Sequence, residues 1–108
     1  MWYEQHNKRA EKIIGLEHLK TIREVNLWID RYFESMGPAH RRELHHQYGI
    51  EAARSLYGDI GARIAELHIK DDYNGEIPRI DEYRWPDNII QPRDPVVKEI
   101  YDWYMSLR

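Results

Sequence analysis

The sequence predicts an all-α protein, a compact bundle of four to five helices with an additional amphipathic helix at its C-terminus. Apolar residues recur at intervals of three and four along most of the chain, which is the spacing of one helix face. Glycine and proline separate these stretches, and no run alternates apolar and polar residues for long enough to form a strand. The 108 residues suit one domain, so we expect a single helical domain over residues 1–108.

The first two helices are predicted over residues 2–14 and 16–33, on either side of Gly15. The first is short and polar, and we expect His6 to lie on its surface. The second has an apolar stripe at helical spacing, formed by Leu19, Ile22, Val25, Ile29 and Phe33. This stripe predicts the face that packs on the core.

A third helix is predicted from Pro38 to about Tyr57, because proline suits a first helical turn and Gly58 suits the stop after the last. A fourth follows over residues 59–73.

The end of the chain is predicted to contain two further elements. Residues 79–85 read as a short helix that Pro86 stops, and residues 86–94 read as a linker. From Pro95 onwards, residues 95–108 form an amphipathic helix. Its apolar face is formed by Val97, Ile100, Tyr101, Tyr104 and Leu107.

The composition excludes several classes of protein. No apolar run approaches the length of a membrane span, and the N-terminal residues lack the apolar centre of a signal peptide, so we expect a cytoplasmic protein. The absence of cysteine excludes disulfides, iron–sulfur clusters and zinc fingers, and leaves imidazole and carboxylate groups as metal ligands. The formal net charge of −3 argues against general nucleic-acid binding.

The stretch HRRELHHQYG, residues 40–49, holds three of the six histidines. On one continuous helix, His45 lies near the centre of an apolar stripe, with His46 about 100° away on its flank. The stripe is formed by Leu44, Tyr48, Ala52 and Leu56. His40 lies about 140° away on the other side, so we expect it to be exposed or at an interface. Arg41 shares the side of His45, where its charge needs an anionic partner or a route to solvent along its own stem.

The fourth predicted helix adds His68 and Asp72, which share a face because they are four residues apart. With His45 they form a two-histidine, one-carboxylate set of the kind that binds zinc, manganese or non-haem iron. His18, on the inner face of the second helix, is a further candidate ligand, and Glu66 is the candidate general base. The alternative is a buried histidine–aspartate pair that only braces two helices.

Three elements of the chain also follow a known order over residues 16–85. The matching residues are Trp28 and Asp30, then His40, Arg41, His45, His46 and Gly49, then Glu66, His68, Lys70, Asp72, Gly75, Ile77 and Pro78. They resemble a family of small, histidine-rich bacterial and phage proteins that is classified only as a domain of unknown function. Where that family ends its pattern with Asp–Trp, this chain has Glu82 and Tyr83, and its final helix is additional. The resemblance implies that the two histidine-bearing helices form one unit, and it brings no established activity.

Three functions remain open. In the first, which we favour, the protein binds a small anionic molecule of the nucleotide type, and in a phage it would sequester an immune signal as an anti-defence protein. The residues expected to contact this ligand are Arg41, His45, His46, Tyr48, His68 and Asp72. In the second, a divalent metal on His45, His68 and Asp72, with His18 or His46 as a further ligand, supports a hydrolase. In the third, residues 95–108 make the protein an inhibitor or assembly module, or a homo-oligomer.

Overall fold

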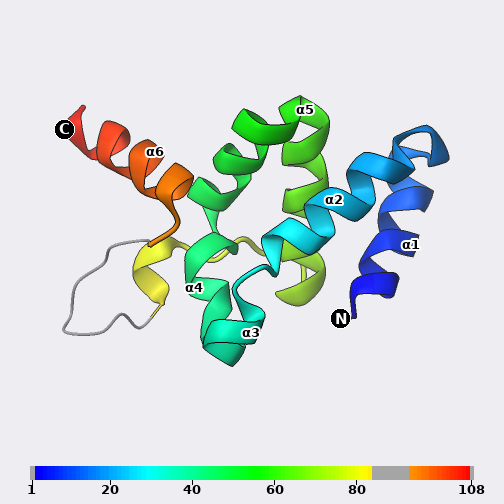
Figure 1. The fold of residues 1–108 in the computed structure, drawn as a ribbon, viewed down its shortest axis with the longest axis horizontal. Helices are drawn as coiled ribbons and strands as arrows, with labels where there is room; N and C mark the ends of the chain where they lie inside the picture. The colour runs from blue at the N-terminus through cyan, green and yellow to red at the C-terminus, as the bar shows by residue number, and fades with distance from the viewer. Residues whose placement is uncertain (1, 84–92, 108) are drawn as a thin grey trace.

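The computed structural model describes residues 2–83 and 93–107, and it confirms the all-α class (Figure 1). The elements are α1 (Tyr3–Ile14), the 3₁₀ turn η1 (Leu16–His18), α2 (Leu19–Ile29), α3 (Phe33–Met36), η2 (Gly37–His40), α4 (Arg41–Leu44), α5 (Gln47–Asp72), η3 (Ile80–Glu82) and α6 (Pro95–Ser106). α2 packs against both α1 and α5, and α6 packs against α5. Figure 1 shows α1 and α6 at opposite ends of the molecule. Within the described ranges, no helix is long and apolar enough to cross a membrane.

α2 supplies the core with the residues that its spacing predicts. Ile22, Val25 and Ile29 are fully buried. Phe33, expected on the same face, is instead 58% exposed, because α2 ends at Ile29 and Asp30 leaves helical geometry. The predicted single helix is therefore wrong in its last turn, and a short separate helix, α3, follows.

The chain also leaves helical geometry at His45 and His46, where the sequence predicts one continuous helix. His45 has φ −86° and ψ 61°, and His46 is extended. The Nδ1 atom of His46 accepts a hydrogen bond from the Gly49 backbone at 3.3 Å and so caps α5. A Cβ on Gly49 would lie 1.7 Å from the Leu44 carbonyl oxygen, so only glycine lets the chain approach itself this closely.

Gly58 divides α5 into two helical halves, as its place in the sequence predicts. Its φ of 76° and ψ of −171° are outside the helical range and are easily adopted only by glycine. The chain turns at the top of α5 in Figure 1, and the second half ends at Asp72. Leu56, predicted within an apolar stripe, is 49% exposed, whereas Ala52, one turn earlier on the same stripe, is fully buried.

The predicted helix over residues 79–85 is reduced to the single turn of η3. Trp85 and Pro86 lie outside the described residues, as does the predicted linker up to residue 92.

α6 confirms the predicted C-terminal helix. Its first turn is capped by Asp94, whose Oδ1 accepts hydrogen bonds from the backbones of Val96 and Val97 at 3.1 Å. Val97 is buried, whereas Tyr104 is 43% and Leu107 66% exposed. The apolar face of α6 therefore packs on the core only near its beginning.

Candidate metal centre

Four histidines and two aspartates meet in one place, although they come from separate parts of the chain. The members are His6 of α1, Asp30 at the end of α2, His40 of η2, His45 at the break before α5, and His68 and Asp72 of α5. All four histidines are buried, while the Asp30 side chain is 33% exposed. We refer to these six residues as the histidine–aspartate cluster.

Two imidazoles and two carboxylates form the centre of the cluster. The Nε2 atoms of His45 and His68 lie 3.5 Å and 3.4 Å from the same oxygen, Oδ2 of Asp72. Asp30 divides its oxygens between the same rings, with Oδ1 3.3 Å from His45 Nε2 and Oδ2 3.3 Å from His68 Nε2. Ligand atoms of a four-coordinate zinc ion, with bonds of about 2.0–2.1 Å, lie about 3.3–3.4 Å apart. These distances approach that spacing, and two three-residue groups of the cluster have ligand atoms within 4.8 Å of one another: Asp30 with His45 and His68, and Asp72 with His6 and His68.

The ring positions show which histidines can share one ion. Two imidazoles that bind a tetrahedral ion through Nε2 have ring centres about 5.2 Å apart, and those of His45 and His68 are 5.3 Å apart. His6 and His68 are stacked with centres 3.5 Å apart, which is too close for both to bind the same ion. His6 Nε2 lies instead 3.3 Å from Oδ1 of Asp72. It contacts the carboxylate through the oxygen other than the one near His45 and His68.

Hydrogen bonds around His68 fix which of its ring nitrogens carries a proton. Asn26 donates through Nδ2 to Asn7 Oδ1 at 2.8 Å, which directs Asn26 Oδ1 toward His68 Nδ1, 3.0 Å away. An amide oxygen only accepts, so Nδ1 of His68 carries a hydrogen. In the neutral ring the Nε2 lone pair then faces Asp30 and Asp72, which requires a cation between them or a second proton on the ring. Histidines that bind metals have this kind of second hydrogen bond.

His40 is held in the same way. Its Nδ1 donates to the Gly37 carbonyl at 2.8 Å, and its Nε2 lies 3.0 Å from Oδ1 of Asp30. With Nδ1 donating, Nε2 of a neutral ring is an acceptor, and so is the carboxylate oxygen. A hydrogen bond between them needs one proton, which His40 and Asp30 share. The pair lies on the exposed side of the cluster.

The electrostatics of the cluster favour ionised carboxylates. Burial would raise the pKa of Asp30 and of Asp72, but close contacts with the surrounding histidines outweigh it and hold both values far below the ordinary range. Burial also disfavours a charged His68, yet its contacts with Asp30 and Asp72 raise its pKa overall. In the metal-free protein, a proton on His68 therefore supplies the positive charge that the two carboxylates require.

A pocket of about 430 Å³ opens onto the cluster. Its lining includes Asp30, His40 and Asp72, so the cluster is reached from solvent on this side. The other lining residues are Trp2, Tyr3, Asn26, Leu27, Arg31, Phe33, Glu34 and Arg41. An ion bound in the cluster would lie beside a space large enough for a small molecule.

The structure brings His45, His68 and Asp72 together, as the sequence analysis expects, but it changes the rest of the set. His40 and His6, expected to be exposed, are 6% and 2% exposed and belong to the cluster. Asp30 was not among the predicted site residues. The only indication of it in the sequence was the Trp–apolar–Asp element, in which it matches the resembled family.

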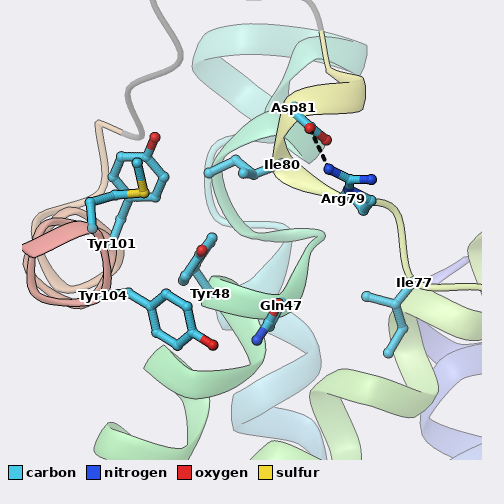
Figure 2. Close-up of a pocket in the computed structure, with 9 residues that line it drawn as sticks. Gln47, Tyr48, Ile77, Arg79, Ile80, Asp81, Tyr101 and Tyr104 are labelled. Atoms are coloured by element: carbon cyan, nitrogen blue, oxygen red, sulfur yellow. Dashed lines mark hydrogen bonds and ion pairs between the residues drawn. The ribbon is translucent and has the colours of Figure 1, made fainter. Parts of the chain in front are cut away.

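Two of the predicted ligand-binding residues lie away from the pocket. His46 has both ring nitrogens engaged, since Nε2 donates to the Arg42 carbonyl at 3.0 Å while Nδ1 caps α5. Burial lowers the pKa of His46 to about 4, so the ring is neutral. Tyr48 lines a different cavity, of about 690 Å³, where Figure 2 shows it facing Tyr101 and Tyr104 of α6. That cavity shares no lining residue with the pocket at the cluster.

The remaining two candidates are also outside the cluster. The ring of His18 is 37% exposed and lies 3.6 Å from Glu17, its neighbour in the chain, so it is not placed to bind the same ion. Glu66 forms an ion pair with Lys70 at 2.7 Å, and both side chains are more than one-third exposed. Its expected role as general base does not fit this position.

No protein-family model, curated protein or solved structure matches this chain. The resemblance to the small histidine-rich family therefore rests on the residues quoted for it, and the function has to be argued from the cluster itself.

Proposed function

We propose that this chain is a metal-dependent hydrolase whose divalent ion is bound by His45, His68 and Asp72. One observation carries the proposal. The Nδ1 hydrogen of His68 is committed to Asn26, so in the neutral ring its Nε2 lone pair faces the carboxylates of Asp30 and Asp72. A cation at this position accepts the lone pair and neutralises the carboxylates together. Because the three ligands are two imidazoles and one carboxylate, we expect zinc, with manganese or iron(II) as alternatives.

The remaining members of the cluster have supporting roles. A divalent ion held by these ligands would lower the pKa of a bound water molecule to about 7. Asp30 lines the pocket and its carboxylate is ionised, so it would act as the general base toward that water. His6 contacts the second oxygen of Asp72 and orients this carboxylate ligand.

The first test is the metal content of the folded protein. Metal-free protein is mixed with Zn²⁺, Mn²⁺ or Fe²⁺, desalted and measured by elemental analysis. We expect one zinc ion per chain in the wild type and in His18→Ala, a matched control that removes a histidine outside the cluster. His68→Ala and Asp72→Asn should retain less than a tenth of it, with helical circular dichroism preserved. A wild type that binds no metal would refute the proposal.

The second test separates binding from chemistry. Asp30→Asn removes the proposed base but leaves all three ligands, so it should retain zinc while hydrolysis of 4-nitrophenyl esters falls at least about 100-fold. Loss of zinc in Asp30→Asn would show instead that Asp30 is a ligand. Unchanged hydrolysis in this variant would rule out its role as base.

An assembly function through α6 is a second candidate, favoured by the exposure of its apolar side chains. Trp103 is 62%, Met105 38% and Leu107 66% exposed. We expect a Trp103→Ala, Leu107→Ala double variant to shift any oligomer to the monomer in light scattering coupled to size-exclusion chromatography. A wild type that is monomeric at all concentrations would remove this candidate.

A further inference from the structure

We infer that the pocket at the cluster binds a phosphate ester that carries an aromatic ring, of the class of the nucleoside monophosphates. Arg41 binds the phosphate, and Phe33 packs against the ring. This inference rests on the proposed function, because one phosphate oxygen would bind the ion. The inference also goes beyond the proposed function, because the ion alone does not specify a substrate.

Arg41 is held beside the cluster with its guanidinium free to bind an anion. The group lies over the Tyr73 ring, 5.3 Å from its centre, and that ring also contacts His45. Among residues 2–83 and 93–107, no carboxylate lies within 4.0 Å of the charged atoms of Arg41. Arg31, the second arginine of the pocket, also lies over an aromatic ring, that of Tyr32. A guanidinium presents paired donors that match two phosphate oxygens.

The charge of the pocket makes anion binding depend on the metal. Its lining carries two arginines and three carboxylates, Asp30, Glu34 and Asp72, which gives a formal charge of −1 when His40 is counted as neutral. A divalent ion changes this to +1. A phosphate monoester has enough oxygens to contact both the ion and an arginine, whereas a carboxylate has only two. We therefore expect phosphate to bind the metal-loaded protein and not the metal-free one.

The rim of the pocket carries exposed apolar side chains, in contrast to the charged residues of the cluster. Phe33 is 58% exposed, and its ring centre lies 5.4 Å from that of His40, so it is fixed next to the cluster. Trp2 and Leu27, also on the lining, are 81% and 59% exposed. Apolar side chains exposed together at a pocket mark a ligand surface. A nucleobase that stacks on an aromatic side chain gains affinity of about tenfold or more.

The experiment is isothermal titration calorimetry of zinc-loaded protein with two probes. These are inorganic phosphate and the phosphonate analogue of adenosine monophosphate, whose P–C bond resists hydrolysis. We expect the analogue to bind at least tenfold more tightly than phosphate. Arg41→Ala should weaken both at least tenfold. Phe33→Ala should weaken the analogue to the level of phosphate and leave phosphate unchanged.

Two matched controls are available on α5. Arg63→Ala and Leu56→Ala remove exposed side chains that do not line this pocket, and they should bind both probes as the wild type does. Zinc content is measured in every variant, so a failure of the metal site is recognised separately. If zinc-loaded wild type binds neither probe, or Arg41→Ala binds both normally, the substrate class is wrong while the metal centre stands.

Discussion

Zinc should stabilise this protein strongly, because its proposed ligands lie on separate elements that come together only in the folded chain. His45 lies at the break before α5, and His68 and Asp72 lie near its end. If the unfolded chain binds zinc weakly, free zinc at 1,000 times the dissociation constant stabilises the fold by about 4 kcal/mol. For a domain of this size, each kcal/mol raises the Tm by roughly 4–8 °C. Differential scanning calorimetry should therefore show a rise of roughly 15–30 °C.

The pH dependence of this stabilisation has a definite sign. The pKa of His68 is raised in the folded, metal-free protein, so its contribution is fully present below about pH 6.5, the ordinary value, and is lost as the pH rises through the folded value. Zinc binding has the opposite trend, because His68 must release its proton. At pH values below the pKa of His68 in the folded protein, release of this proton lowers the dissociation constant for zinc about tenfold for each unit that the pH rises. As the pH rises above about 6.5, metal-free protein should thus lose stability, and the rise in Tm on adding zinc should become larger.

Two results would refute this reasoning. A Tm that does not respond to zinc at pH 8 would show that the cluster binds no zinc. An equal rise in His68→Ala would show that zinc binds elsewhere, and His18→Ala serves again as the control that should respond as the wild type does.

Three further predictions concern residues outside the cluster, two that lie next to it and one that caps α6. Gly49→Ala places a Cβ 1.7 Å from the Leu44 carbonyl oxygen, so urea denaturation should show a loss above about 4 kcal/mol, and wild-type stability would contradict the described break. Tyr83→Phe removes the hydroxyl that donates to the His45 carbonyl at 2.6 Å. It should weaken zinc binding about tenfold in a chelator competition. Unchanged zinc affinity would show that other contacts hold His45 in place. Asp94→Ala uncaps α6 and should cost about 1–2 kcal/mol in the same denaturation assay while zinc content stays at the wild-type level.

The part of the cluster that lies on one helix could be predicted from the sequence. His68 and Asp72 are four residues apart, and this spacing alone places both side chains on one face of a helix. His45 was expected to point inward, and it is fully buried. Local periodicity was sufficient for His68 and Asp72, whereas His45 points inward from a break that the helical pattern does not predict.

The other members depend on contacts that periodicity does not show. A continuous helix puts His40 on the side away from His45, whereas the break between α4 and α5 brings both rings to Asp30. His6 was missed for another reason. The buried residues of α1 are His6, Asn7 and Ala10, so the inward face of this helix is mostly polar and gives no apolar stripe to recognise.

The hydrogen bonding of the cluster favours the proposed metal site over a structural brace. A histidine–aspartate brace is stable when each buried ring nitrogen has a hydrogen-bond partner. Here both ring nitrogens of His6 and of His45, and Nε2 of His68, are buried without a hydrogen bond, although the three Nε2 atoms lie 3.3–3.5 Å from carboxylate oxygens. Each unsatisfied group costs about 1–3 kcal/mol, which is a large share of the stability of a small domain. An ion bound by the Nε2 atoms of His45 and His68 removes that cost for two of these five atoms. The same ion balances the charge of Asp72, so folding and the proposed chemistry depend on one binding event.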